Sequence, residues 1–395
     1  MKRKEAMALL AFGAVRLFAG KKVIVPGGAA RGALPLSPAI EAGDFVYVSG
    51  MVGRDSRGQF ARGDVKAQTR RTLENVGAAL EAAGLNFAHI VSTNLYLSDI
   101  RHLPAADGAY REFFRDGFPA RTTLEAVLMN PDAMVEVSAI AIRDAGRKRL
   151  IHPAGWPAPR SCASYAMEAG DTLFLSALQP VDARSSKLAG DSIHLQTEQV
   201  MRNQEALLET AGMGFADLVS SRIYLAEPSD YNGLNEAYRK FVIAVPPVRA
   251  TVHAYPVESG HLLQIQSVAV RGSGKARPSG DGYTSPIHSY SVAAGNRIYI
   301  TGMTGRGADG QFAKGNIRAQ TRQALATIDE QLARQGATFA DVVDSTVWLK
   351  DARDFAGMNE VYAEIVQPNP PARSTVRIPP SAPEALVEIM MLAVR

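Results

Sequence analysis

Residues 53–70 read GRDSRGQFARGDVKAQTR, and residues 305–322 read GRGADGQFAKGNIRAQTR. The two stretches share their first pair, a central Gly-Gln-Phe-Ala and the final Ala-Gln-Thr-Arg, at an offset of 252 residues. The same offset relates Tyr110 to Tyr362 and Glu136 to Glu388. Self-similarity at one fixed spacing is the signature of repeated domains. The first and last thirds of the chain are therefore predicted to be copies of one unit.

A third copy lies between these two. Offsets of 127 and then 128 residues relate Ser37 to Ser164 and Gln68 to Gln196, so one residue is inserted between Ser176 and Gln196. Three copies also suit a chain of 395 residues, because single domains usually run to about 100–200 residues. The predicted units are an N-terminal extension over 1–21 and domains over 22–144, 148–271 and 282–395. The boundaries lie in polar, glycine-containing stretches at 144–148 and 271–280.

Each copy shows one order of elements. Alternating apolar residues predict an early strand, and apolar residues at helical spacing, such as Leu73, Val76 and Leu80, predict a helix after the Gln-Thr pair. A second strand, a second helix and a last strand follow. The predicted strands are 45–49, 90–97 and 135–142 in the first copy, 173–176, 218–225 and 263–270 in the second, and 298–301, 342–349 and 388–394 in the third.

These elements predict an α/β (α+β) unit in which two helices cover one face of a mixed sheet. The other sheet face is then apolar and must also be covered. We expect three linked copies to bury these faces against one another around a pseudo-threefold axis, because tethered modules meet at high effective concentration.

Composition narrows the function classes. The chain is 46% apolar and 21% charged, as in an average soluble protein, and its net charge of +4 comes from scattered Lys and Arg. Nucleic acid is not an expected partner, since its binding usually needs a basic stripe. Cys162 is the single cysteine, which excludes an intrachain disulfide and suits a reducing compartment. The seven His residues show no metal-ligand spacing, so no metal or cofactor is expected.

The N-terminus permits two interpretations. Lys2–Lys4 followed by the apolar run Met7–Phe12 resembles a secretory signal, but Glu5 and Arg16 interrupt the pattern. No apolar run approaches the roughly 18 residues of a membrane-spanning helix, so no membrane partner is expected. We expect a cytoplasmic protein and leave the signal peptide open.

The third copy resembles the RidA (YjgF) family in several motifs. These are Ala319-Gln-Thr-Arg322, Asn359-Glu-Val-Tyr362, Pro371-Ala-Arg-Ser-Thr-Val376 and Val387-Glu-Ile389. The resemblance extends over all three copies and implies a chorismate-mutase-like fold. Single-domain members form trimers whose active sites lie in clefts between subunits. This chain is accordingly expected to form an intramolecular pseudo-trimer as a monomer, with three chemically distinct clefts.

The family's marker is an arginine in Pro-x-Arg that grips the substrate carboxylate, and Arg121, Arg249 and Arg373 match it. Guanidinium offers a rigid fork that binds a carboxylate through two parallel hydrogen bonds. The alternative for each arginine is a structural salt bridge.

Fifteen residues later the family has a glutamate that positions or activates water. Glu136 and Glu388 match it and are the predicted catalytic residues, whereas the middle copy has Gln264. Glutamine can orient water but cannot take its proton at neutral pH. The middle copy also has Ala177 where the family has bare glycine backbone. The middle copy is therefore predicted to hold a degenerate site. Which cleft is active, and which copy lends residues to which cleft, stay open.

The resemblance implies further substrate contacts. A Ser-Gly-Gln motif, whose hydroxyl and backbone face the ligand in the family, is matched in part by Ser49-Gly50 and Thr301-Gly302, and its Gln is absent throughout. A serine after a tyrosine is matched by Ser37, Ser164 and Ser289, with the tyrosine replaced by Leu36, Ala163 and His288. The cleft asparagine is matched by Asn235 and Asn359, with Asp107 in the first copy.

Three functions remain open at this point. The resemblance implies a hydrolase that converts carboxylate-bearing enamines and imines to 2-keto acids and ammonia without a cofactor. The incomplete motifs also permit a non-catalytic protein that binds a carboxylate metabolite. RNA cleavage, attributed to some relatives, is a weaker alternative.

Overall fold

The computed structural model describes residues 20–27, 34–114, 117–242, 245–273, 285–307 and 309–395. The signal-like segment and most of the 271–280 linker lie outside these residues. Among the helices it describes, none combines the length and the apolarity that crossing a bilayer requires.

The first copy forms a six-stranded mixed sheet in the order β1-β2-β3-β7-β4-β5, in which only β4 and β5 pair in parallel. Its elements are β1 (Lys22–Ile24), β2 (Ala39–Ala42), β3 (Phe45–Val52), α1 (Val65–Ala82), β4 (Ile90–Leu97), α2 (Leu103–Tyr110), β5 (Ala120–Glu125), β6 (Val127–Leu128) and β7 (Val135–Ile142).

The second copy repeats this plan with sheet order β12-β11-β13-β10-β9-β8. Its elements are β8 (Lys148–Ile151), β9 (Ala166–Ala169), β10 (Thr172–Leu178), α3 (Ile193–Thr210), β11 (Leu218–Leu225), α4 (Tyr231–Tyr238), β12 (Val248–His253) and β13 (Leu263–Val270).

The third copy has sheet order β14-β15-β18-β16-β17-β6, so a short strand of the first copy completes its edge. Its elements are β14 (Ser291–Ala294), β15 (Arg297–Thr304), α5 (Ile317–Arg334), β16 (Val342–Leu349), α6 (Phe355–Ile365), β17 (Ala372–Arg377) and β18 (Val387–Val394). The predicted mixed sheet with two helices is thus confirmed in every copy. The early strands run beyond their predicted ends, to Val52 in the first copy.

The repeated Gln-Thr pair ties each long helix to the loop before the last strand. In the first copy, the buried Gln68 side chain donates to the carbonyl oxygens of Ala61 and Asp132 and accepts from the Met134 N–H. Gln196 and Gln320 make the corresponding bonds in the other copies. Asp64, Ser192 and Asn316 cap the three helices, as side-chain acceptors at these positions should. The motif therefore fixes the same local geometry three times.

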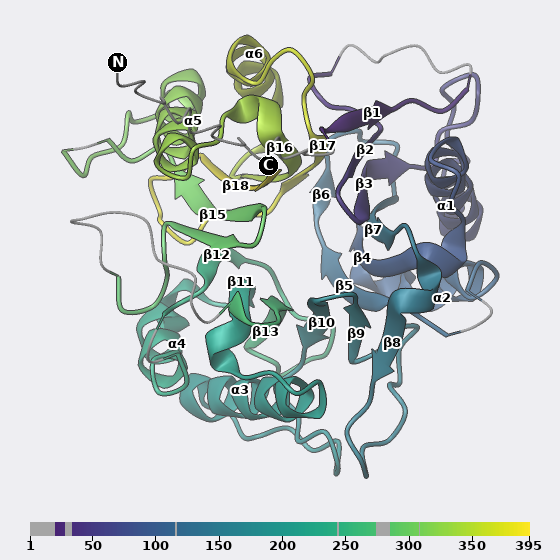
Figure 1. The fold of residues 1–395 in the computed structure, drawn as a ribbon, viewed down its shortest axis with the longest axis vertical. Coiled ribbons are helices and arrows are strands. Elements are labelled where there is room, and N and C mark those ends of the chain that lie inside the picture. The colour runs from purple at the N-terminus through teal and green to yellow at the C-terminus, as the bar shows by residue number, and fades with distance from the viewer. Residues whose placement is uncertain (1–19, 28–33, 115–116, 243–244, 274–284, 308) are drawn as a thin grey trace, which may run out of the picture.

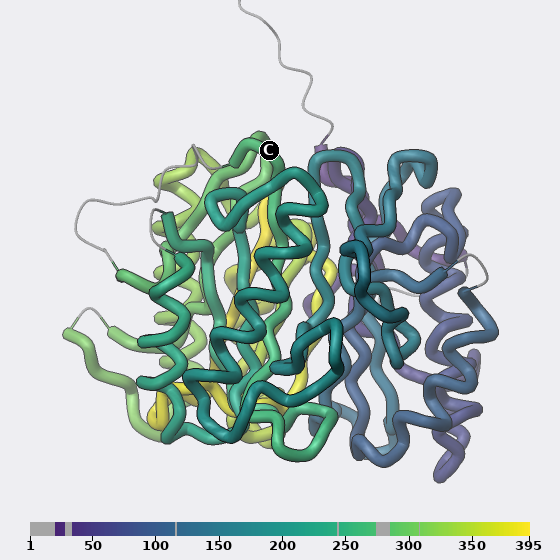
Figure 2. The backbone as a smooth tube through the Cα atoms, turned by 90° about the horizontal axis from the view of Figure 1, so that it is seen from below, coloured from purple at the N-terminus to yellow at the C-terminus, as the bar shows by residue number. Residues whose placement is uncertain are grey.

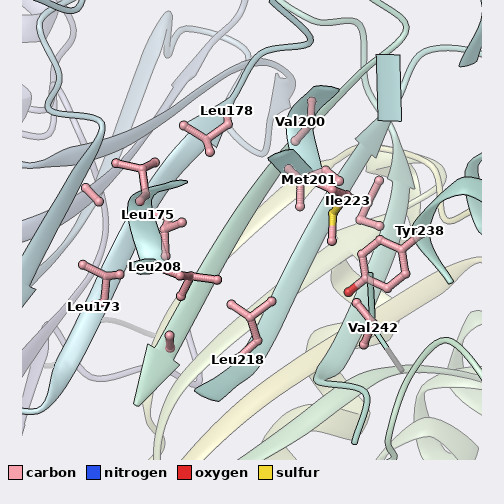
Figure 3. Close-up of a cluster of buried hydrophobic side chains, with 14 of the residues drawn as sticks. Leu173, Leu175, Leu178, Val200, Met201, Leu208, Leu218, Ile223, Tyr238 and Val242 are labelled. Carbon is pink, nitrogen blue, oxygen red and sulfur yellow. The ribbon is translucent and has the colours of Figure 1, made fainter. Parts of the chain in front are cut away.

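Each copy has its own core between the sheet and its helices. Figure 3 shows the second copy, where Leu173 and Leu175 of β10 face Val200, Met201 and Leu208 of α3. The predicted stripe of Leu73, Val76 and Leu80 is fully buried in the equivalent core of the first copy. These cores use only one face of each sheet.

The other sheet faces meet in the middle of the molecule. The helices lie at the periphery and the strands face inward (Figure 1), and the three copies stand side by side when seen from below (Figure 2). Two apolar clusters between the sheets each draw residues from all three copies, and one contains Tyr96, Tyr224 and Trp348. These three side chains occupy the same position in their copies and are fully buried. The expected burial of the inner faces against one another is therefore present.

Trp348 tests how much this shared cluster contributes to stability. Trp348→Ala should lower the free energy of unfolding by about 3–5 kcal/mol, because it removes a large buried side chain and leaves a cavity. Urea unfolding of the whole chain measures this. Trp348→Tyr is the matched control, since tyrosine fills this position in the other copies, and it should cost much less. Equal stability of all three proteins would contradict a shared core.

Candidate functional site

Three equivalent contacts join the copies in a closed cycle. The Arg373 N–H donates to the Ser49 hydroxyl at 2.8 Å, the Arg121 N–H to Ser176 at 2.8 Å and the Arg249 N–H to Thr301 at 2.9 Å. Each bond connects the strand that carries the marker arginine to the early strand of the next copy. Every predicted arginine therefore lies at a seam between two copies.

The predicted serine and threonine ligands act as clamps at these seams. Ser49 also donates to the Ser37 carbonyl at 2.6 Å, and Thr301 donates to the Arg249 carbonyl at 2.6 Å. The Ser37 and Ser289 hydroxyls donate at 2.6 Å to the carbonyls of Pro370 and Pro246. Each of these hydroxyls already donates its proton to protein backbone, so toward a ligand it could act only as an acceptor, and the expected ligand contact stays a prediction. Their place is structural: they hold the arginine strands in position.

The Arg373 side chain is buried but incompletely bonded. Its guanidinium lies 4.6 Å from the centre of the Tyr362 ring, and Nη2 donates to Asn359 Oδ1 at 2.7 Å. Nε and Nη1 are buried and lack a partner. Buried N–H groups without partners are rare and costly in proteins. The free donors therefore mark a place for an anionic group.

Arg249 repeats this arrangement. Its carbon Cζ lies 5.1 Å from the centre of the Tyr238 ring, Nη2 donates to Asn235 Oδ1 at 2.8 Å and Nε donates to Thr251 at 2.9 Å. Nη1 is buried without a partner. The two predicted asparagines thus orient the two arginines, and the tyrosine rings also support the cations.

The two glutamates meet arginines of other copies. Glu136 of the first copy lies beside Arg373 and is hydrogen-bonded to the Ser374 hydroxyl. Glu388 of the third copy lies beside Arg249 and accepts from the Thr251 backbone. The structure therefore pairs Glu136 with Arg373 and Glu388 with Arg249, each across a seam. Sequence alone could not show which copy supplies which half of a cleft.

Burial determines the protonation of these glutamates. Desolvation raises the pKa of both carboxyls from 4.5 to about 8, and the neighbouring arginines oppose the rise without cancelling it. Glu136 Oε1 is buried and has no hydrogen-bond partner. Each carboxyl thus holds its proton at neutral pH and can give it to a bound molecule, which makes it suited to acid–base chemistry.

Glycine is needed at the point of the early strand where the glutamate carboxyl lies against the backbone. A Cβ added at Gly50 would lie 2.0 Å from Glu136 Oε1, and one at Gly302 would lie 2.0 Å from Glu388 Oε1. The middle copy has Ala177 at this position and Gln264 in place of the glutamate. The two departures therefore belong together, since the alanine methyl takes the space that a glutamate would need.

The third cleft, at Arg121, differs in charge. Arg121 Nη1 donates at 2.7 Å to Asp107, so the guanidinium already has a carboxylate partner from its own copy. Across the seam lie Ala177 and Gln264, whose Nε2 donates to the Thr123 carbonyl. This corrects the prediction for the middle copy: its two departures alter the cleft of Arg121, whereas the cleft of Arg249 has a glutamate. For Arg121, the alternative of a structural salt bridge is the observed one.

Sequence reasoning named His288 only as a replacement of the family's tyrosine, and it missed Gln179 and His261. His288 lies beside Arg249 where the family has tyrosine, and burial lowers its pKa to about 4, so its ring is neutral. Gln179 and His261 lie with Gln264 in the Arg121 cleft. Comparison of the copies position by position could have found both, because neither matches the other two copies. Over the residues that the structure covers, no cluster of His, Cys, Asp and Glu could hold a metal ion.

Comparisons with known proteins agree with the repeat. A family model described as endoribonuclease L-PSP matches residues 29–143, 157–271 and 283–395. A RutC family protein of Pyrococcus horikoshii is 35% identical over 125 residues, which are 31% of this chain and 99% of that protein. The human 2-iminobutanoate/2-iminopropanoate deaminase is 33% identical over 110 residues, which are 28% of this chain and 80% of that protein.

One solved structure resembles a single copy of the chain, and another resembles most of its length. The YjgF gene product of E. coli is 31% identical with a TM-score of 0.30, and the match covers 31% of this chain and 99% of that one. A chorismatase is 14% identical with a TM-score of 0.52 over 78% of this chain and 93% of its own. The second likeness concerns the fold alone.

The raised pKa values predict a specific dependence of stability on pH. A carboxyl whose pKa is higher in the folded chain than in the unfolded one stabilises the fold below its unfolded pKa, and this contribution is lost as the pH rises toward the folded pKa. For Glu136 and Glu388 the window runs from about pH 4.5 to 8. Within this window each carboxyl should lower the free energy of unfolding by about 1.4 kcal/mol for every pH unit of increase.

The double variant Glu136→Gln/Glu388→Gln isolates this effect. The free energy of unfolding is measured by urea unfolding of both proteins at each pH. The value for the double variant minus the value for the wild type should increase from pH 5 to pH 8 and then level off. Subtraction removes the contributions of all other groups. A difference that stays constant, or falls with pH, would show that the carboxyls are ionised in the folded protein.

Proposed function

The chain belongs to the RidA family, whose endoribonuclease L-PSP model matches each of its three copies, and from this premise we propose that it hydrolyses carboxylate-bearing imines and enamines to 2-keto acids and ammonia. The human relative named 2-iminobutanoate/2-iminopropanoate deaminase supports this class of reaction. One observation carries the proposal: at two seams an arginine with unpartnered, buried N–H groups lies beside a buried glutamate whose pKa is raised to about 8.

Substrate binding follows from the free donors. A carboxylate placed at Arg373 can accept from Nε or from Nη1, which lack other partners and point to different sides of the guanidinium, and one at Arg249 can accept from Nη1. Charge-assisted hydrogen bonds of this kind are stronger than neutral ones, most of all away from water. The anion thereby offsets part of the desolvation of the arginine. The same step fixes the substrate against the early strand of the neighbouring copy, near the glutamate.

The glutamate supplies the proton that the reaction needs. For 2-aminoacrylate, transfer of a proton to the terminal carbon and loss of one from nitrogen gives 2-iminopropanoate. Water then adds to the imine carbon, with its proton going to nitrogen, and the carbinolamine expels ammonia to leave pyruvate. One water is consumed and the glutamate ends as it began. Glu136 and Glu388 can give and retake protons near pH 7 because their pKa values lie close to it.

In this proposal the whole chain acts as a monomeric pseudo-trimer with two active clefts, one of Arg249 and Glu388 and one of Arg373 and Glu136. A purely carboxylate-binding protein would have no need of buried, protonated glutamates beside its anchors. RNA cleavage has less support, because phosphate backbones are contacted by accessible Lys and Arg, whereas Arg249 and Arg373 are only 5% and 2% exposed.

Ammonia and keto-acid release from freshly generated 2-aminoacrylate tests the proposal. Arg249→Ala and Arg373→Ala should each raise the barrier by about 2–4 kcal/mol at their own cleft, the scale for removing a charged hydrogen-bonding partner. Each single variant keeps the rate of the other cleft. The double variant should fall to the spontaneous rate even though Arg121 is intact.

Arg318→Ala is the matched control, because Arg318 pairs with Glu360 on the exposed surface, away from every seam. It should hydrolyse the substrate like the wild type. No release above the spontaneous rate by the wild type, on 2-aminoacrylate or on bulkier imino acids, would refute the deaminase and favour a carboxylate-binding protein. Full activity in the double variant would place the reaction elsewhere.

A further inference from the structure

The cleft at Arg121 opens into a cavity that the proposed reaction does not use. Its volume is about 300 Å³, within the range of small-molecule sites. Residues of the first and second copies line it, among them Arg121, Trp156, Tyr165, Gln179, His261 and Gln264.

Three polar residues of the middle copy form one hydrogen-bonded chain in this cavity. Gln179 Nε2 donates to Gln264 Oε1 at 2.6 Å, and Gln179 Oε1 lies 2.8 Å from His261 Nδ1. The corresponding residues are Val52, Ala133 and Glu136 in the first copy and Thr304, Ala385 and Glu388 in the third. Loss of the glutamate is thus accompanied by two side chains that the other copies lack at these positions: Gln179 bonds to the replacement Gln264, and His261 bonds to Gln179. A site that had merely lost its function would not be expected to gain such partners.

This chain of side chains presents both donors and acceptors. The amide oxygen of Gln179 can only accept, so His261 Nδ1 carries the proton between them, and His261 Nε2 remains an acceptor. Burial lowers the pKa of His261, so the ring is neutral at pH 7. Gln179 Nε2 has a second proton and Gln264 Oε1 a second lone pair. This set has one free donor and two free acceptors, so it complements an amide group, which offers two donors and one acceptor.

The charges in the cavity cancel. Asp107 neutralises Arg121 at 2.7 Å, and the other two charged residues that line the cavity are Arg160 and Glu258, of opposite sign. In the other two clefts Asn235 and Asn359 take the place of Asp107 and leave the arginine charged. An anion would gain little at Arg121, whereas an uncharged ligand would not need to displace the ion pair.

The walls suit a planar molecule. The ring centroids of Trp156 and Tyr165 lie 4.9 Å apart, edge to face, and both rings line the cavity. The lining also includes Val181 and Ser186, in the stretch between Ser176 and Gln196 that carries the one-residue insertion of the middle copy. Ser186 adopts the left-handed backbone conformation with φ 56°, which is uncommon for a residue other than glycine. The stretch that carries the insertion thus contributes to the lining of this cavity.

We propose that the Arg121 cleft is a non-catalytic binding site for an uncharged, planar small molecule that carries an amide group. Gln179, Gln264 and His261 would bond to the amide edge, and the aromatic wall of Trp156 and Tyr165 would pack against the rest. One protein would then hold two clefts for anionic substrates and a third cleft with a different ligand.

Tryptophan fluorescence gives a readout confined to this cleft. The chain has two tryptophans, and Trp348→Tyr removes the one in the central cluster, so that Trp156 alone reports. Benzamide and benzoate are the matched probes, since they share a ring and differ in charge. Benzamide should change the Trp156 emission in a saturable way, and benzoate should not do so at the same concentrations.

Two further substitutions use residues that the other copies already carry. Gln179→Val copies Val52 of the first copy and should weaken benzamide binding by about tenfold, as expected for the loss of hydrogen bonds to a neutral group. Asp107→Asn copies Asn235 of the second copy. It frees the Arg121 charge and should strengthen benzoate binding at Trp156 by about tenfold or more.

Benzoate binding more tightly than benzamide in the Trp348→Tyr protein would overturn the proposal, and so would a Trp156 emission that benzamide leaves unchanged. Unaltered benzamide binding in Gln179→Val would also contradict it. Because the emission reports binding without any turnover, these outcomes are independent of whether imines are hydrolysed at the other two clefts.

Discussion

The inner face of each sheet is apolar, and the helices of a copy cover only the outer face. The remaining face can be buried only against the other copies, which is why residues of all three meet around Tyr96, Tyr224 and Trp348. This burial brings the arginine strand of one copy to the early strand of the next, where Ser49, Ser176 and Thr301 bind the arginine backbone. The clefts are thus a consequence of how the copies pack. A single copy would hold half of each of two different clefts.

Function at the seams conflicts with stability. Arg249, Arg373, Glu136 and Glu388 are nearly inaccessible to solvent, and two of the guanidinium donors of Arg373 lack partners. Burial of such groups is unfavourable unless they are paired and hydrogen-bonded, so they lower the stability of the fold. The same groups stay available to bind a ligand. The clamping hydroxyls and the shared apolar clusters offset this loss. At Arg121 the conflict is absent, because Asp107 completes the ion pair, and this cleft can take a different ligand.

Much of the fold could be predicted from the sequence because periodicity is a local signal that occurs three times. The strands over 90–97, 135–142, 218–225, 263–270 and 342–349 have the predicted bounds. The marker arginines and glutamates could also be found, since they lie at fixed spacing in each copy. Their pairing could not, because it depends on the order in which the copies pack. Sequence therefore assigned Gln264 to the middle copy but could not show that it lies in the cleft of Arg121. Likewise, Ser49 and Thr301 were expected to face a ligand, since sequence does not show that a neighbouring backbone occupies their hydroxyls.

The central claim is that three seams of one chain carry two kinds of cleft. The most direct test is the number of product-like carboxylates that one chain binds, measured by isothermal titration calorimetry with pyruvate on the full-length protein. Two sites per chain are expected, at Arg249 and Arg373, because these arginines have buried N–H groups without partners. Three equivalent sites per chain would show that Asp107 does not neutralise Arg121 toward anions, and would contradict the distinction between the clefts.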